Sequence, residues 1–282
     1  MDSRKTVLIT GCSSGIGHAL AREFSSKGLR VFATARQSSS LSDLEQNGIE
    51  TFSLEVTNAE SISNLKKEIS SRTNGKLDML VNNAGRNYTV PALDIDFDEV
   101  QSTFEVNVIA VMRMCKEFSP LLIESKGTIV QLGSLAGLMP YVFGSVYNAS
   151  KAALHAYSDT LRVELAPFGV KVVTVVTGGV KSNIARVDRV LPEDSIYLPI
   201  NSDYLRRTKH SQEVGMVTEE YAKSVVSQLL HSPQKKVIWE GSKSWLVWFA
   251  SSFLPKSVLE FYMSRTFSLW KLTSPEATKK LA

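Results

Sequence analysis

The sequence predicts a doubly wound α/β domain, in which a mostly parallel sheet has helices on both faces. Short apolar runs rich in β-branched residues alternate with longer stretches of helical period. The alternation continues without a linker, repeat or low-complexity run through residues 1–241, so we expect one domain there. Residues 242–282 form an apolar, Trp-rich stretch, which we expect to be a helical extension.

The expected elements follow in chain order. The predicted strands are 6–10, 30–35, 51–54, 77–81, 127–132 and 171–176. The predicted helices are 14–27, 61–71, 98–124 and 147–166. Residues 178–217 look irregular and charged, and a loop of that length is uncommon unless it is functional.

Composition limits the function classes. With 43% hydrophobic and 21% charged residues, the 282-residue chain can bury a sizeable core. A net charge of +4 is too weak and dispersed for a nucleic-acid partner. Cys12 and Cys115 have no metal-ligand spacing and suit a reducing compartment, so we expect no metal. The first residues run straight into the apolar strand, so we expect no signal peptide.

A glycine-rich loop joins the first predicted strand to the first helix. Its spacing is Thr-Gly-x-x-x-Gly-x-Gly, and a plain turn is the alternative interpretation. Glycines let the backbone approach a pyrophosphate, and a helix N-terminus offers free N–H groups and partial positive charge. We therefore expect the loop to bind a dinucleotide. The expected contacts are Gly11, Ser13, Ser14, Gly15, Ile16 and Gly17.

Tyr147 and Lys151 form the candidate acid/base pair. They are four residues apart on a predicted helix and so share one face. An ammonium near a phenol favours the phenolate and lowers its pKa, which suits proton transfer to a carbonyl oxygen. Ser134 ends a predicted strand, where ligands bind in such sheets, and could anchor that oxygen. A surface pair and a capping serine are the plainer alternatives.

These motifs together resemble the short-chain dehydrogenase/reductase family over about residues 5–240. The resemblance rests on the glycine loop, Asn82-Asn83-Ala84-Gly85, Asn107, Ser134 and Tyr147-x-x-x-Lys151. It implies a Rossmann-like fold in which Asn83 lies along the cofactor and supports the sheet. It also implies that Asn107 holds a water linking Lys151 to solvent; a satisfied core asparagine is the alternative. The catalytic residues would be Ser134, Tyr147, Lys151 and Asn107, with Tyr147 and Lys151 also at the cofactor.

The cofactor expected is NADP(H). Arg36 ends the second strand where an acidic residue would bind the ribose of NAD, and an arginine suits a 2′-phosphate. Two departures from the family pattern stand nearby. Glu55-Val56 replaces the usual Asp-Val beside the adenine, and Thr177-Gly178 replaces Pro-Gly at the nicotinamide. The resemblance also places Val180 and Ser182 on the cofactor.

Within the family, several segments resemble the fungal NADPH-dependent reductases of 1-acyldihydroxyacetone phosphate. They are 76–78, 82–85, 133–137, 177–180 and 191–197. The implied reaction reduces a lipid-like ketone, here to 1-acylglycerol 3-phosphate, an EC 1.1.1 activity. The alternative enzyme tailors polyketide or terpenoid intermediates in secondary metabolite biosynthesis. A nucleotide sensor without catalysis is a third hypothesis, although it would be expected to lose Tyr147 or Lys151.

The remaining expectations concern the substrate side and partners. Lys181, Arg186 and Arg189 could meet a substrate phosphate, or be solvated loop charges. His155 is expected to be a packing residue. The Trp-rich stretch 245–254 is too short to span a bilayer, but could lie in a membrane interface. The alternative is a helix that packs on its own domain, lines the substrate pocket or joins subunits.

We accordingly expect a lipophilic ketone or alcohol substrate and peripheral contact with a membrane or lipid droplet. The corresponding location is the cytoplasmic face of the endoplasmic reticulum or a lipid droplet, with the cytoplasm as alternative. The family resemblance implies a homodimer or homotetramer formed through helices 99–124 and 148–166.

Overall fold

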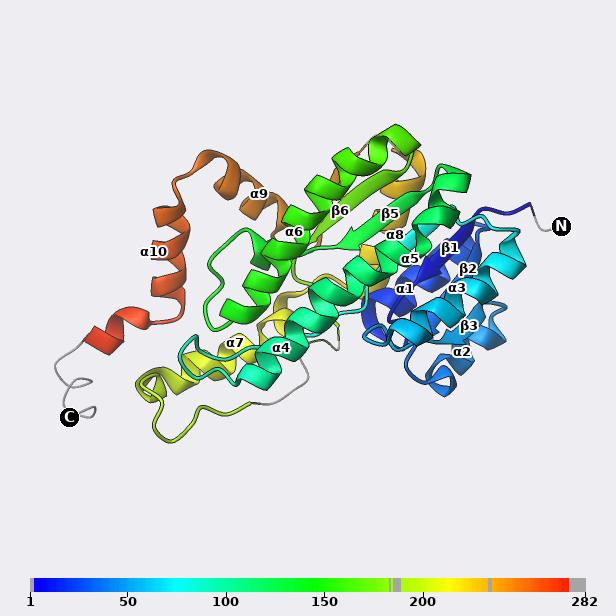
Figure 1. The fold of residues 1–282 in the computed structure, drawn as a ribbon. Helices are drawn as coiled ribbons and strands as arrows, with labels where there is room; N and C mark the ends of the chain where they lie inside the picture. Colours follow the sequence, from blue (N-terminus) through cyan, green and yellow to red (C-terminus); the bar gives the residue numbers. More distant parts are fainter. Residues whose placement is uncertain (1–2, 183, 185–188, 233–234, 274–282) are drawn as a thin grey trace.

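The computed structural model describes residues 3–182, 184, 189–232 and 235–273. Its centre is a seven-stranded parallel sheet in the order β3-β2-β1-β4-β5-β6-β7 (Figure 1). The predicted doubly wound α/β fold is therefore confirmed. The chain builds outward from β1 to β3 and then returns to place β4 beside β1. This reversal creates the crevice at the carboxyl ends of β1 and β4 where ligands bind in such sheets.

The strands are short, and the first six lie close to the predicted ranges. They are β1 (Thr6–Ile9), β2 (Arg30–Ala35), β3 (Glu50–Ser53), β4 (Met79–Asn82), β5 (Thr128–Leu132), β6 (Lys171–Thr177) and β7 (Val237–Glu240). The helices are α1 (Gly15–Ser26), α2 (Ser42–Gln46), α3 (Ala59–Thr73), α4 (Phe97–Phe104), α5 (Ala110–Ser125), α6 (Ser145–Leu165), α7 (Asn201–Val214), α8 (Thr218–His231), α9 (Ser244–Phe253) and α10 (Lys256–Thr266).

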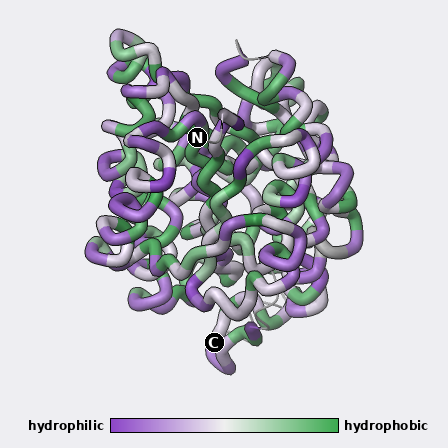
Figure 2. Tube along the Cα trace, turned by 90° about the vertical axis from the view of Figure 1, so that its right-hand side faces the viewer, coloured by the Kyte–Doolittle hydropathy of each residue, from purple (hydrophilic) through white to green (hydrophobic). Residues whose placement is uncertain are grey.

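Two apolar cores cover the two faces of the sheet. Alternate residues of β1 divide between them, because side chains of a strand point to opposite faces. Val7 and Ile9 pack in a core with α1 and α8, whereas Leu8 packs in a second core with α3, α5 and α6. Figure 2 shows apolar segments through the middle of the molecule and polar ones along its rim.

The structure corrects the interpretation of residues 178–217 as irregular. This stretch contains α7, a helix of 14 residues. Its sequence is mostly polar, so few apolar residues mark a helical period, and its buried positions include Tyr204 and Arg207. The sequence reasoning also missed α8, which packs beside α1, and β7, which completes the far edge of the sheet.

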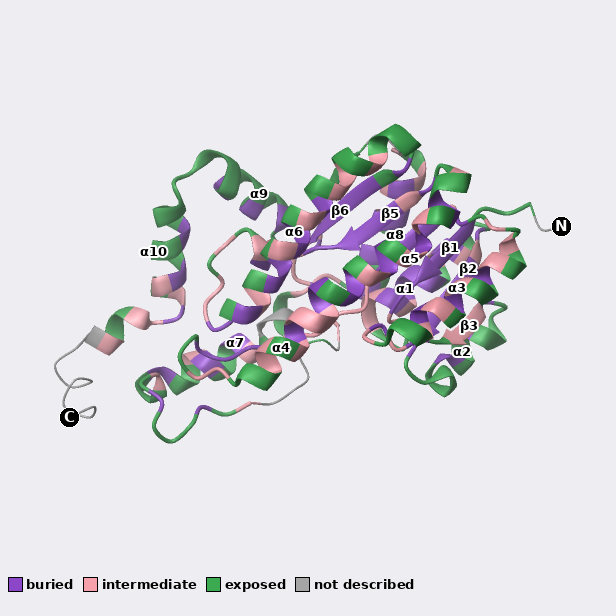
Figure 3. Ribbon diagram, viewed as in Figure 1, coloured by how far each residue is buried: buried purple, intermediate pink, exposed green. Residues whose placement is uncertain are grey.

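The C-terminal extension consists of α9 and α10, separated at Leu254-Pro255. Both helices lie at the end of the molecule far from β3 (Figure 1). Their inward residues are buried while their outward residues are exposed (Figure 3). Met263 and Phe267 pack against Phe143 and Tyr204 in a third apolar cluster, hereafter the aromatic cluster. Within the described residues, no helix has the length and apolar character needed to cross a bilayer.

Candidate active site

The glycine loop passes very close to the neighbouring strand end. Gly11 has a φ of +72°, and a Cβ there would lie 2.9 Å from Ala84 Cα. A Cβ on Gly17 would lie 2.3 Å from both Gly11 O and Asn83 Nδ2. Asn83 Nδ2 donates to the carbonyl oxygens of Thr10 (2.8 Å) and Gly11 (3.0 Å). A side chain larger than glycine at position 11 or 17 would therefore push the loop away from Asn83. The two hydrogen bonds donated by Asn83 hold the loop in this shape.

The start of α1 has the properties of an anion site. Ser14 is the N-cap, but its side chain makes no capping hydrogen bond, and no acidic residue lies in the first turn. Ser13 and Ser14 are exposed, Gly15 and Ile16 are half-buried, and Gly17 is buried. The uncapped N–H groups and the helix dipole suit a pyrophosphate here. The loop residues thus fit a dinucleotide, although their individual contacts remain predictions.

Arg36 and Glu55 follow β2 and β3. Arg36 is exposed, and in the described part of the chain its guanidinium has no ion-pair partner. It is therefore available to a phosphate. One carboxylate oxygen of Glu55, Oε1, accepts from the backbone N–H (3.2 Å) and hydroxyl (2.9 Å) of Thr57. Glu55 thus forms hydrogen bonds within its own turn. Its predicted contact with the adenine would have to be made by its other carboxylate oxygen.

The structure brings Ser134, Tyr147 and Lys151 together at the carboxyl end of β5. The hydroxyls of Ser134 and Tyr147 are hydrogen-bonded to each other. Lys151 Nζ donates to Leu132 O at 2.8 Å and lies 5.9 Å from the centroid of the Tyr147 ring. An ammonium has three N–H donors, so two remain for a cofactor hydroxyl or a water. The spacing on α6 therefore places both groups on the side of Ser134, as predicted.

The expected pKa effect of Lys151 on Tyr147 is wrong. Burial raises the pKa of Tyr147, while the hydrogen bond from Ser134 and the charge of Arg207 lower it, and burial prevails. The opposing cation is Arg207 of α7, because the Lys151 ammonium is directed at Leu132 O. Burial also lowers the pKa of Lys151 to about 8. Tyr147 is thus held as a protonated acid at neutral pH.

Asn107 lies in a π-helical turn (Glu105–Ile109) between α4 and α5, a local distortion often found at functional sites. Its Oδ1 accepts from Arg86 N (2.9 Å), and its Nδ2 donates to Arg86 O (2.9 Å) and Ser150 Oγ (3.0 Å). Both amide hydrogens are therefore used. Asn107 braces the loop after β4 against α6, and any water at its side chain would have to donate to Oδ1.

His155 was expected to be a packing residue, and the structure shows a more specific contact. Its Nε2 accepts from the backbone N–H of Ser134 at 3.2 Å. A Cβ on Gly133 would lie 2.3 Å from the same nitrogen. Burial, followed by the charge of Lys151, lowers the pKa of His155 to about 4, so the ring is a neutral acceptor at neutral pH. The glycine before Ser134 was the only signal in the sequence for this close approach.

Hydrogen bonds and close backbone contacts hold the loop after β6 against the β7 edge of the sheet. Thr177, which replaces the family proline, shares a 2.7 Å hydrogen bond with the hydroxyl of buried Tyr221. A Cβ on Gly178 would lie 2.4 Å from Ser242 O, so that glycine is required. The side chain of Val180 is buried in the core beside α1, and its backbone forms a parallel bridge with Met216. Ser182 is half-buried at the end of this loop.

The predicted phosphate contacts in the substrate loop are only partly visible. Arg186 lies outside the described residues. Arg189 pairs with Glu99 at 2.5 Å and lies over the Tyr88 ring, so its charge is already engaged. Lys181 is exposed. The cation whose charge acts on Tyr147 is instead Arg207.

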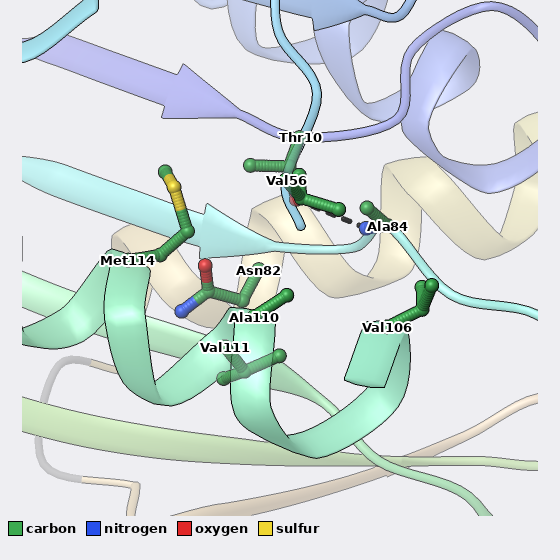
Figure 4. A pocket seen from close by; sticks show the side chains of 8 residues that line it. All are labelled: Thr10, Val56, Asn82, Ala84, Val106, Ala110, Val111 and Met114. Atoms are coloured by element: carbon green, nitrogen blue, oxygen red, sulfur yellow. Dashed lines mark hydrogen bonds between the residues drawn. The ribbon is translucent and has the colours of Figure 1, made fainter. Parts of the chain in front are cut away.

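A small hollow lies behind the glycine loop, between β4 and α5 (Figure 4). It has room for about one water molecule. The buried Oδ1 of Asn82 has no hydrogen-bond partner here, and a water could supply one. The hollow is too small for a nucleotide, which would lie across the strand ends. It is lined by Thr10, Val56, Asn82, Ala84, Val106, Ala110, Val111 and Met114.

A parallel sheet with a glycine-rich loop at its switch point, next to a half-buried tyrosine and a buried lysine, is typical of a nucleotide-dependent oxidoreductase. The family model for short chain dehydrogenases matches residues 5–190. The chain therefore belongs to the short-chain dehydrogenase/reductase family.

Similar proteins cover almost the whole chain. "Short-chain dehydrogenase srdE" of Neurospora crassa is 43% identical over 274 residues, covering 96% of this chain and 94% of that protein. "NADPH-dependent 1-acyldihydroxyacetone phosphate reductase" of Schizosaccharomyces pombe is 41% identical over 271 residues, covering 94% and 88%. A short-chain dehydrogenase structure from Streptomyces avermitilis aligns with a TM-score of 0.80 at 26% identity, covering 97% and 100%. The extension is thus part of the length shared with these relatives.

Proposed function

We propose that the protein is an NADPH-dependent reductase of a ketone carried by a lipid-like molecule. The model substrate is 1-acyldihydroxyacetone phosphate, which would become 1-acylglycerol 3-phosphate. The observation that carries the proposal is the hydrogen-bonded Ser134–Tyr147 pair beside the aromatic cluster. Phe143, buried in that cluster, lies in the loop that leads into α6, four residues before Tyr147 in the chain. The reacting groups therefore adjoin an apolar surface suited to an acyl chain.

The chemistry needs a hydride at the carbonyl carbon and a proton at its oxygen. NADPH supplies the hydride when it is bound. The Tyr147 hydroxyl donates its proton to the carbonyl oxygen, and the Ser134 hydroxyl holds the same oxygen in line. The raised pKa of Tyr147 keeps this proton in place until the oxygen gains charge. The two free donors of Lys151 hold a cofactor hydroxyl or the water that restores the proton.

The cofactor of this family member is NADP(H). Exposed Arg36 follows β2 and suits the 2′-phosphate, while the uncapped start of α1 suits the pyrophosphate. The Schizosaccharomyces pombe relative is named as NADPH-dependent. A metagenomic short-chain oxidoreductase determined with NADP is 31% identical, with a TM-score of 0.58 and coverage of 61% of this chain and 81% of that one. Glu55, Asn83, Val180 and Ser182 complete the proposed cofactor contacts.

The outer faces of α9 and α10 support peripheral membrane contact. Trp245, Phe253 and Phe261 are 71%, 64% and 62% exposed. Lys243 and Lys256 lie at the starts of the two helices, where they can meet anionic headgroups. We place residues 242–282 as a membrane-facing extension and the enzyme at the cytoplasmic face of the endoplasmic reticulum or on lipid droplets, with the cytoplasm as alternative. The arrangement would let a lipid substrate reach the aromatic cluster directly.

Vesicle co-sedimentation tests the membrane contact. Replacement of Trp245, Phe253 and Phe261 by Ser should reduce binding to vesicles of phosphatidylcholine with phosphatidylserine, because apolar area is lost from the interface. The matched control replaces Leu93 and Phe97 by Ser, which are 73% and 77% exposed elsewhere. Equal binding by both variants and the parent protein would rule out the proposed surface.

We also propose a homodimer or homotetramer formed through α4, α5 and α6. Ile109 in the π-helical turn and Met112 on α5 are exposed apolar residues, and Val163 is exposed near the end of α6. Sedimentation of the purified protein measures the state directly, and a monomer at micromolar concentration would reject the proposal.

A second candidate function is the tailoring of a polyketide or terpenoid intermediate in secondary metabolite biosynthesis. It is favoured by the fact that relatives at 43% and 41% identity are named only as short-chain dehydrogenases. The same acid/base pair and an apolar pocket would serve such a ketone. The two candidates differ in whether the substrate bears a phosphate.

NADPH oxidation by the purified protein separates these functions. We expect turnover with 1-acyldihydroxyacetone phosphate and little with a panel of steroid, retinoid and polyketide ketones. Tyr147→Phe serves as the chemical control. Turnover of a polycyclic ketone without turnover of the acylated phosphate would favour the second candidate. Full biological activity of Tyr147→Phe would favour a nucleotide sensor instead.

A further inference from the structure

Arg207 is a buried cation that the chemistry described so far does not use. It lies on α7, and its side chain is 6% exposed. Arginine is almost never buried to this degree without an opposite charge, because removing the guanidinium from water costs several kcal/mol. The contacts of this residue therefore need an explanation.

The contacts of Arg207 leave most of its donors unused. Its Nε donates to Val142 O at 3.1 Å, and its Cζ lies 3.5 Å from the centroid of the Tyr141 ring. Across the described ranges, neither terminal nitrogen has a hydrogen-bond partner, and no carboxylate pairs with the side chain. Other arginines of the chain do pair with carboxylates, including Arg30, Arg72, Arg86, Arg113, Arg162, Arg189 and Arg206.

The guanidinium lies at the first turn of the helix that carries Tyr147. A Cβ on Gly144, the N-cap of α6, would be 3.4 Å from Arg207 Nη2 and 3.1 Å from Asn148 Oδ1. That Asn148 oxygen is itself buried without a partner. Gly144 has no capping side chain, and no acidic residue lies in the first turn of α6. Helix N–H groups and Arg207 thus both present positive charge there.

The position is on the substrate side of the acid/base pair. Tyr141, Val142 and Gly144 belong to the segment between Ser134 and Tyr147, and Tyr141 and Val142 also border the aromatic cluster. Gly144 precedes Tyr147 by three residues, which is close to one helical turn, or about 5.4 Å. The charge of Arg207 acts on Tyr147 itself. A ligand that reaches the Tyr147 hydroxyl could therefore reach Arg207 too.

We propose that Arg207 binds an anionic group of the substrate, a phosphate or a carboxylate, about one helical turn from the ketone held by Ser134 and Tyr147. This inference rests on the proposed reductase function and names its specificity-determining residue. In an acyldihydroxyacetone phosphate, one methylene separates the phosphate ester from the keto carbon, so both groups can be held at once. The planar fork of arginine suits a bidentate bond to either anion.

Steady-state kinetics at saturating NADPH test the proposal. The parent enzyme, Arg207→Met and Arg207→Lys are compared on 1-acyldihydroxyacetone phosphate and on the unphosphorylated acyldihydroxyacetone. Arg207→Met should raise the KM for the phosphorylated ketone about 10- to 100-fold, the loss typical of a charged hydrogen bond. The KM for the neutral ketone should change much less, and Arg207→Lys should fall between. A long-chain keto acid distinguishes carboxylate from phosphate recognition.

Arg206→Met is the matched control. Arg206 is the adjacent residue of α7, but its side chain is 46% exposed and pairs with Asp203. Its guanidinium also lies over the Phe267 ring of the aromatic cluster, so any change in KM should be equal for the charged and the neutral ketone. An equal loss on charged and neutral ketones in Arg207→Met would overturn the proposal and assign Arg207 to support of α6 and Tyr147. If Arg207→Met does not fold, the charged-to-neutral KM ratio of Arg207→Lys decides the question.

A binding measurement separates failure of this inference from failure of the proposed function. With NADP⁺ saturating, 1-acylglycerol 3-phosphate should raise the melting temperature of the parent protein more than monoacylglycerol does. Arg207→Met should abolish that difference. If the parent enzyme reduces neither ketone but retains the difference, the proposed reaction fails and the anion site stands. If it reduces both ketones equally and shows no difference, the anion site fails and the reductase stands.

Discussion

The nucleotide end and the substrate end of the crevice are built in different ways. At the nucleotide end, side chains such as Asn83 and Lys151 bond to backbone oxygens, and glycines allow the close approaches. At the substrate end, aromatic side chains from four separate segments pack together around Phe143. The difference teaches that the nucleotide end is shaped by contacts to the backbone, whereas the other end is shaped by side-chain packing beside one buried charge, Arg207.

Removing the hydroxyl of Tyr147, the proposed proton donor, is the change with the largest expected effect. Tyr147→Phe should lower kcat/KM for ketone reduction about 1,000-fold, the middle of the range for a general acid. The melting temperature should change little, since the ring remains. Stopped-flow or steady-state NADPH oxidation measures the effect. Tyr157→Phe, on the same helix but packed in the core beside α5, is the control and should retain activity. A loss below tenfold in Tyr147→Phe would assign the proton to another group.

The hydrogen bond from the backbone N–H of Ser134 to His155 can be tested through the pH dependence of stability. Its pKa is about 4 in the folded protein and 6.5 in the reference state. The unfolded state therefore binds more protons between these values, and folding stability falls as the pH falls from 6.5 to 4. The contribution amounts to about 3 kcal/mol.

The measurement is urea unfolding at several pH values in the parent and in His155→Gln. The amide oxygen of glutamine can still accept from Ser134 N–H, but it does not titrate. The variant should therefore lose less stability over this range. Parallel pH profiles for the two proteins would contradict the buried neutral imidazole.

Gly17→Ala probes the close approach at the glycine loop. The new Cβ would meet Gly11 O and Asn83 Nδ2 at 2.3 Å, so the loop must shift. We expect a loss of about 2 kcal/mol in unfolding free energy, as for an overpacked site, together with weaker NADPH binding. Calorimetry with and without NADPH measures both.

Gly28→Ala is its control. Gly28 has a φ of +80° but open space around it, so the variant carries backbone strain alone. It should lose about 1 kcal/mol of stability and keep its affinity for NADPH. Unchanged NADPH affinity in Gly17→Ala would show that the loop does not hold the cofactor.

Arg36→Ala is expected to have the smallest effect of the four. The residue is exposed, so its bond to a 2′-phosphate is weakened by solvent. We expect kcat/KM with NADPH to fall about tenfold, about 1.4 kcal/mol, while the value with NADH stays the same. An equal loss with both cofactors would place Arg36 elsewhere than at the 2′-phosphate.

Much of the sheet and the candidate site could be predicted because the signals are local. Six of the seven strands appear as β-branched runs, and the predicted range of β2 matches the structure. The four-residue interval places Tyr147 and Lys151 on one face of α6. In contrast, α7 escaped prediction because the buried residues described in it are a tyrosine and an arginine, and β7 is only four residues long. The pKa relation between Lys151 and Tyr147 also depended on burial and on Leu132 O, which no spacing reveals.

The sequence by itself determined the parallel sheet, the glycine loop and the tyrosine–lysine pair, since strand composition, turn glycines and helical period act over a few residues. Only the tertiary structure decided which charge faces Tyr147. Arg207 is 60 residues further along the chain, and it reaches Gly144 because α7 packs over the carboxyl edge of the sheet. It likewise decided that α9 and α10 bury one face and expose another. Long-range packing sets these contacts, because burial depends on elements that are far apart in the sequence and meet only in the folded chain.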